Sequence, residues 1–128
     1  MISIVSIYVG GILTLFMAIF HIRFPKIFRW GKDYGRITDI NRRIFHTIHL
    51  ALVLILFIFG IISVFYVSEL SESKGISFGL NLMISIFWLW RTIWQIFYFK
   101  GKTMHYVLIG IFSILFASYL IPIIHNLI

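Results

Sequence analysis

The chain has 128 residues, enough for one domain, and 61% of them are hydrophobic, against roughly 45–50% in an ordinary soluble domain. A soluble protein of this composition would lack polar surface, so lipid is expected to surround most of it. The formal charge of +7 lies between apolar runs, which is typical of contacts with the bilayer and its anionic lipids rather than of nucleic-acid binding. The absence of cysteine excludes disulfides, thiolate metal sites and iron–sulfur clusters.

The first apolar run, residues 2–22, predicts a membrane-spanning helix. It has no basic start and is longer than the roughly 7–15 apolar residues of a signal peptide, so we expect it to be retained. One face carries mostly small or hydroxylated side chains at spacings of three and four: Ser3, Ser6, Gly10, Thr14, Met17 and His21. Because small residues let membrane helices approach closely, this face predicts a helix-packing seam.

The connection that follows, residues 23–43, is strongly basic and partly aromatic. Its basic residues are Arg23, Lys26, Arg29, Lys32, Arg36, Arg42 and Arg43, and its apolar ones include Phe24, Ile27, Phe28 and Trp30. The alternation predicts a short segment lying in the membrane interface, interrupted at Gly31 and Gly35. Thr38 or Asp39 is then placed to cap the next helix.

Three further apolar runs, residues 44–67, 76–99 and 103–124, are each long enough to cross about 30 Å of hydrocarbon. The sequence therefore predicts an all-α integral membrane protein, with residues 1–128 forming one transmembrane domain folded as an antiparallel four-helix bundle. The last helix carries another small face, formed by Gly110, Ser113 and Ala117.

The charges of the connections predict the orientation. The first and third connections hold 9 basic residues, whereas the second, residues 68–75, holds 1. The positive-inside rule places the first and third in the cytoplasm, so both termini are expected outside. The predicted location is the cell membrane, as a multi-pass protein of a bacterial inner membrane.

A histidine- and arginine-rich patch is expected near the cytoplasmic leaflet, where antiparallel threading brings the helix ends within reach of one another. Its members are His21, His46, His49, Arg91, Gln95 and His105. A preference for the interface explains most of them, but His49 and Arg91 lie deeper. A charge at that depth costs about 2.5–3.5 kcal/mol unless it is paired, and no predicted span contains a carboxylate.

One hypothesis for this patch is a cofactor or metal site. Imidazole is a common metal ligand, and two histidines can hold a haem axially. The candidate ligands are His21, His46, His49 and His105. A carboxylate-bridged dimetal centre is excluded, because the spans have no Asp or Glu.

A second hypothesis is a pocket for an anionic lipid headgroup, such as a lipid phosphate or a polyprenyl phosphate. Its candidate binding residues are Arg42, His49, Arg91 and Gln95. Flat apolar walls are expected from Trp88, Trp90, Trp94, Phe97 and Tyr98. Nothing in the sequence demands an enzyme.

A third hypothesis is an accessory or structural subunit without ligand chemistry of its own. The patch would then serve assembly, either as a homo-oligomer or within a larger membrane complex. A proton- or cation-coupled carrier is disfavoured, because such carriers generally use carboxylates inside the membrane.

Overall fold

The computed structural model describes all 128 residues and contains helices but no strand. Its four long helices are α1 (Ile2–Ile22), α4 (Asp39–Phe65), α6 (Ile76–Phe97) and α7 (Thr103–Leu127). Its short elements are α2 (Phe24–Ile27), α3 (Trp30–Asp33), the 3-10 turn η1 (Tyr34–Arg36) and α5 (Val67–Glu72). All four long helices are long and apolar enough to cross a membrane, which indicates a multi-pass membrane protein.

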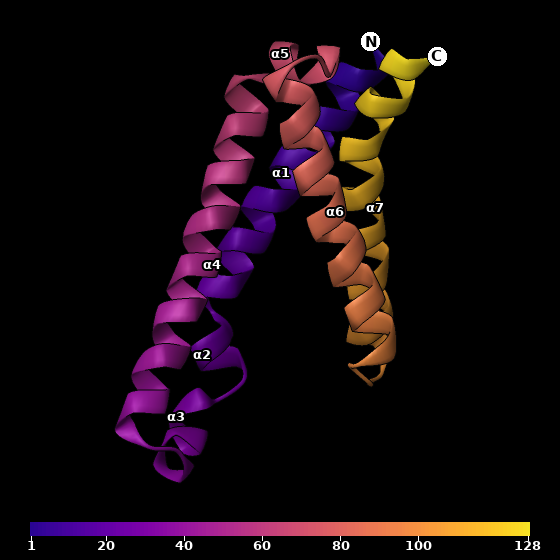
Figure 1. The fold of residues 1–128 in the computed structure, drawn as a ribbon. Helices are drawn as coiled ribbons and strands as arrows, with labels where there is room; N and C mark the ends of the chain where they lie inside the picture. Colours follow the sequence, from indigo (N-terminus) through magenta and orange to yellow (C-terminus); the bar gives the residue numbers. More distant parts are fainter.

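The long helices form two arms that meet at one end and diverge toward the other (Figure 1). The first arm is α1 with α4, and the second is α6 with α7. We call the end that carries both termini and α5 the terminal end, and the opposite end, which carries residues 23–43 and 98–102, the basic end. The expected bundle is therefore closed at the terminal end only, and the helix ends at the basic end do not all meet.

Helix α1 joins the two arms because it packs against both α4 and α7. The face predicted as a packing seam is confirmed, since all six of its residues are buried. Glycine permits the close approach on both sides of the helix. A Cβ on Gly10 would lie 2.7 Å from the Tyr119 ring of α7, and a Cβ on Gly60 of α4 would lie 2.6 Å from the Leu15 side chain of α1. The Ser63 and Tyr119 hydroxyls, 2.5 Å apart, also link α4 to α7.

The terminal end is held by two asparagine side chains. Asn81 is fully buried, and its Nδ2 donates to the Leu70 carbonyl at 2.8 Å and to Ser73 Oγ at 3.3 Å. Asn126 Nδ2 donates to the Ser73 carbonyl at 3.1 Å. Because these bonds join the end of α5 to both α6 and α7, the loop between the arms is fixed where the arms meet.

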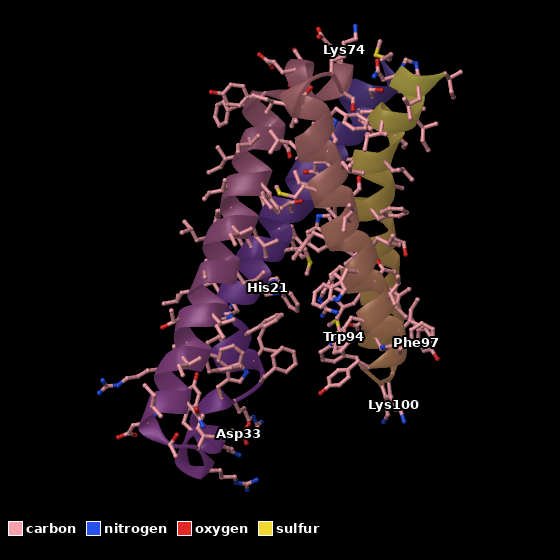
Figure 2. All side chains as sticks on the ribbon, viewed as in Figure 1. His21, Asp33, Lys74, Trp94, Phe97 and Lys100 are labelled. Carbon is pink, nitrogen blue, oxygen red and sulfur yellow. The ribbon has the colours of Figure 1, made fainter.

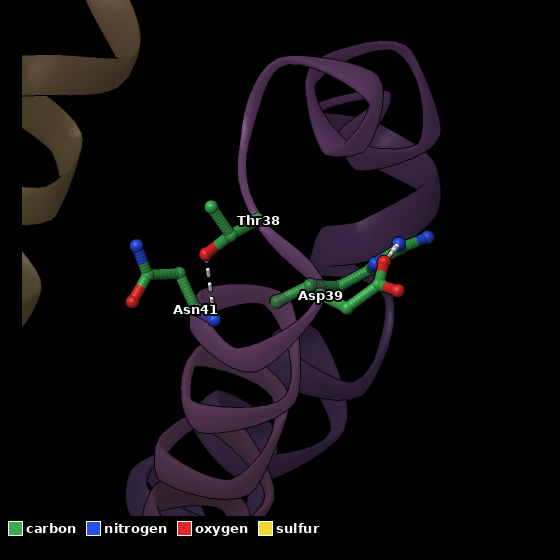
Figure 3. Close-up of polar contacts among 4 residues, drawn as sticks. Thr38, Asp39 and Asn41 are labelled. Atoms are coloured by element: carbon green, nitrogen blue, oxygen red, sulfur yellow. Dashed lines mark hydrogen bonds and ion pairs between the residues drawn. The ribbon is translucent and has the colours of Figure 1, made fainter.

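The basic connection folds into single turns rather than one continuous segment. Its break falls at Arg29, which adopts a left-handed conformation with φ of 52°, whereas Gly31 lies inside α3. Thr38 caps α4, and its Oγ1 accepts a hydrogen bond from the Asn41 amide at 3.4 Å (Figure 3). With this cap, α4 begins at Asp39, five residues before the apolar run expected to cross the membrane.

The small face of α7 points outward. Gly110, Ser113 and Ala117 are exposed, and a Cβ on Gly110 would meet nothing within 4 Å. This face therefore has no packing partner within the chain.

Gly60→Ala is expected to lower the free energy of unfolding by about 1–3 kcal/mol, because the new methyl group would overpack the contact between α4 and α1. Gly110→Ala is the matched control, since it adds the same group to open space and should leave stability unchanged or slightly raised. Reversible unfolding in mixed micelles measures both. Equal effects of the two substitutions would contradict the close packing at Gly60.

Candidate functional site

A cavity of about 310 Å³ lies between the two arms, toward the basic end. Phe59 of α4 and Phe87 of α6 meet edge to face at 6.3 Å between ring centroids, and the cavity lies on the basic side of this contact. Its two polar lining residues are His21 and Arg91. The apolar and aromatic ones are Ile48, Leu52, Leu56, Phe87, Trp88, Trp90, Trp94, Phe99 and Phe112. Figure 2 shows His21 and Trp94 on opposite sides of the gap between the arms.

Arg91 extends among aromatic rings instead of toward an acidic group. Its Cζ lies 4.6 Å from the centroid of the Phe112 ring and 5.1 Å from that of Phe99. Its Nη1 is buried without a hydrogen-bond partner. The only acidic residue in the four long helices is Asp39, which forms an ion pair with Arg42. Arg91 is therefore a half-buried cation with aromatic contacts and no counter-ion.

Trp88 adds a second donor beside Arg91. It is 2% exposed and stacks on Phe112 with the ring centroids 5.6 Å apart. Its Nε1 has no hydrogen-bond partner, although a buried indole N–H usually finds one. The sequence predicted Trp88 as an apolar wall, and its unpartnered N–H is a feature that spacing alone does not reveal.

His21 brings an acceptor from the first arm. Its Nδ1 lies 2.7 Å from the Met17 carbonyl. A carbonyl oxygen can only accept, so Nδ1 carries the hydrogen, and in the neutral ring Nε2 is left as an acceptor. The ring also packs on Phe24 at 4.2 Å between centroids, which fixes its place at the edge of the cavity.

The other histidines predicted as metal ligands lie elsewhere. His49 is buried against Phe24 and Trp30, with ring centroids 6.2 and 4.7 Å away. His46 pairs with Tyr34, its Nδ1 lying 3.5 Å from the phenolic oxygen. On the second arm, His105 Nδ1 lies 3.1 Å from Gln95 Nε2. No group of three or more histidine, aspartate or glutamate side chains is placed to hold a metal ion.

The residues predicted to bind an anion also lie at separate places, and only one of them lines the cavity. Arg91 lines the cavity, whereas His49 belongs to the aromatic cluster of the first arm and Gln95 ties α6 to α7. Arg42, half-exposed at the start of α4, is paired with Asp39. Of all the candidate ligands, only His21 and Arg91 line the cavity together.

The aromatic walls differ in part from those expected. Trp90 and Trp94 line the cavity with Trp88, but Phe97 and Tyr98 are 80% and 66% exposed. Their places are taken by Phe99 and Phe112. Phe112 lies on α7 and lines the cavity because that helix packs against α6, a contact that the sequence alone does not predict.

No protein family, curated protein or solved structure matches this chain. What the cavity can do therefore follows from its own chemistry. Its lining residues include the cation of Arg91, Trp88 with its unpartnered indole N–H, and the imidazole of His21, within apolar and aromatic walls. This set can bind a polar head that carries oxygen atoms, together with an apolar chain.

Arg91→Met is expected to change the free energy of unfolding by less than about 1 kcal/mol in lipid-free micelles. The cost of burying the cation and the gain from its two aromatic contacts are of similar size and opposite sign. Gln95→Leu is the comparison, because it breaks the hydrogen bond to His105 and should destabilise by about 1 kcal/mol or more. A loss of 3 kcal/mol or more for Arg91→Met would mean that the arginine holds the fold together.

Proposed function

We propose that this chain is a multi-pass protein of a bacterial inner membrane that binds an amphiphile with an anionic head. The head would lie between the two arms beside Arg91, and the apolar chain would run along the aromatic walls into the surrounding lipid. The observation that carries the proposal is Arg91, a cation among aromatic rings with no acidic partner in the chain.

An anionic oxygen would satisfy groups that the protein leaves unpaired. Arg91 Nη1 and Trp88 Nε1 are buried donors without acceptors, and both residues line the cavity. Hydrogen bonds from a guanidinium to a charged oxygen are roughly twice as strong as neutral ones. A bound anion would therefore offset the cost of keeping this charge away from water.

The position of the cavity supports a ligand that arrives from the bilayer. Arg91 is six residues before the end of α6, about 9 Å along the helix axis. Helices α4 and α6 diverge toward the basic end (Figure 1), and the cavity lies between them there. A lipid could enter sideways without its chain crossing water.

The basic end would face the cytoplasm. Residues 23–43 with Lys100 and Lys102 hold 9 of the 11 basic residues, and anionic lipid headgroups of that leaflet would attract them. This attraction would also raise the local concentration of anionic amphiphiles beside the cavity.

Arg91→Leu is expected to reduce co-purifying anionic lipid by about tenfold or more, because a lost charge-assisted hydrogen bond weakens binding by at least that factor. Native mass spectrometry of protein extracted in mild detergent measures the bound lipid. Arg43→Leu removes the same charge from the exposed surface of α4 and is expected to leave the bound lipid nearly unchanged.

Equal lipid in both variants and in the wild type would contradict the binding site. The alternative function, an accessory subunit of a larger complex, would then be favoured. The outward small face of α7, formed by Gly110, Ser113 and Ala117, supports that alternative, because such faces pack against other membrane helices.

A reporter fused after Ile128 is expected to report the outside of the cell, because the basic connections retain the opposite end in the cytoplasm. A fluorescent protein reports a cytoplasmic fusion point, and a phosphatase reports one outside the cytoplasm, so the pair covers both results. Cytoplasmic fluorescence from this fusion would reverse the proposed orientation, and a fusion within residues 31–35 should give the opposite signal to the C-terminal one.

A further inference from the structure

We infer that the head bound by this cavity is a phosphate monoester, in preference to a phosphodiester whose head group has no hydroxyl. The inference rests on the proposed function, since it assumes an amphiphile beside Arg91. It adds the chemical class of the head. The deciding observation is the acceptor that His21 presents opposite two donors.

The ring of His21 has one nitrogen already engaged. Its Nδ1 donates to the Met17 carbonyl at 2.7 Å, and the ring packs on Phe24, so its orientation is set by α1 and α2. The neutral ring then has Nε2 as an acceptor, and the side chain lies at the edge of the cavity. A ligand that uses this nitrogen must bring a hydrogen to it or share one with it.

On the other side of the cavity, helix α6 presents hydrogen-bond donors, which require acceptors from the ligand. Arg91 and Trp88 carry only donors, and one nitrogen of each is buried without an acceptor. The head must therefore present anionic or carbonyl oxygens toward α6 and a hydrogen toward α1. His21, Trp88 and Arg91 line the same cavity of about 310 Å³, so a single head group with both properties would meet both requirements.

A phosphate monoester has both properties near neutral pH. Its second proton dissociates at a pH near 6, so a singly protonated form is accessible close to neutral pH. In that form the P–O–H group can donate to Nε2 of His21, while the remaining phosphate oxygens accept from Arg91 and Trp88. A phosphodiester is anionic too, but two of its oxygens are esterified, so the phosphate group itself has no hydrogen to donate near neutral pH.

The apolar walls of the cavity indicate which kind of group is attached to the phosphate of the ligand. Ile48, Leu52 and Leu56 of α4 face Trp90 and Trp94 of α6 across the cavity, and none of these side chains forms a hydrogen bond. A hydrocarbon chain attached to the phosphate would cover them, whereas a soluble phosphate monoester would leave them bare. The ligand is therefore a lipid-linked phosphate monoester rather than a soluble one.

The test is a competition between two lipids with the same acyl chains, dioleoyl phosphatidic acid (a monoester) and dioleoyl phosphatidylethanol (a diester whose head carries no hydroxyl). Native mass spectrometry in mild detergent at neutral pH measures which lipid the protein retains. The wild type should prefer the monoester by about tenfold, the factor expected for one hydrogen bond to a charged group. His21→Phe keeps the aromatic contact with Phe24 but loses the acceptor, so its preference should fall severalfold while the diester still binds.

Two further variants separate a missing acceptor from a damaged fold. His21→Gln retains an oxygen acceptor and should recover part of the preference. His46→Phe changes a histidine of the same arm that pairs with Tyr34 outside the cavity, and it should behave as the wild type does. Retained binding of the diester by His21→Phe shows that the variant is folded. A hundredfold excess of glycerol 3-phosphate, the soluble head alone, should not displace the bound lipid.

The possible outcomes distinguish failure of this inference from failure of the proposed function. Equal binding of both lipids by the wild type, with loss of both in Arg91→Leu, would overturn the inference and leave the proposed function standing. A preference that persists unchanged in His21→Phe would overturn the inference too, because it would stem from the greater charge of the monoester. Binding of neither lipid would overturn both, and displacement by glycerol 3-phosphate would overturn the requirement for a lipid chain.

Discussion

The close packing of α1 against α4 on one side and α7 on the other determines the shape of the molecule. Glycines at the two contacts, Gly60 and Gly10, let the helix backbones approach to a distance that no larger residue would allow. The asparagine bonds at Ser73 fix the arms where the termini lie. No comparable contact joins α4 to α6, so the arms diverge toward the basic end and leave a cavity between them.

The same arrangement explains how one chain can keep an arginine inside an apolar helix. Arg91 lies where the second arm faces the gap, so its guanidinium contacts Phe99 and Phe112 instead of surrounding lipid. Arg91 Nη1 and the Trp88 N–H are already buried without acceptors, and closing the arms would remove the rest of the guanidinium from its surroundings as well. The gap at the basic end therefore leaves room for a ligand that could supply acceptors to these donors. An oxygen-bearing ligand satisfies the donors without changing the packing of α1.

Much of the fold could be predicted from the sequence, because the length of an apolar run and the spacing of small residues are properties of one segment of the chain. The number of long helices, the buried face of α1 and the cap at Thr38 all follow from such patterns. The divergence of the arms could not be predicted, since it depends on which helix faces meet. For the same reason the sequence grouped His46, His49 and His105 with Arg91, whereas the structure places Phe112 there.

Solid-state NMR of the protein in bilayers containing phosphatidic acid tests the central claim most directly. With arginine side chains labelled with ¹⁵N, and the Arg91→Lys protein subtracted, dephasing by ³¹P reports whether a phosphate lies beside this guanidinium. The account predicts clear dephasing of the Arg91 nitrogens, because their charge is satisfied by a phosphate oxygen within hydrogen-bonding distance. Undiminished ¹⁵N signals from a well-folded, lipid-saturated sample would contradict it.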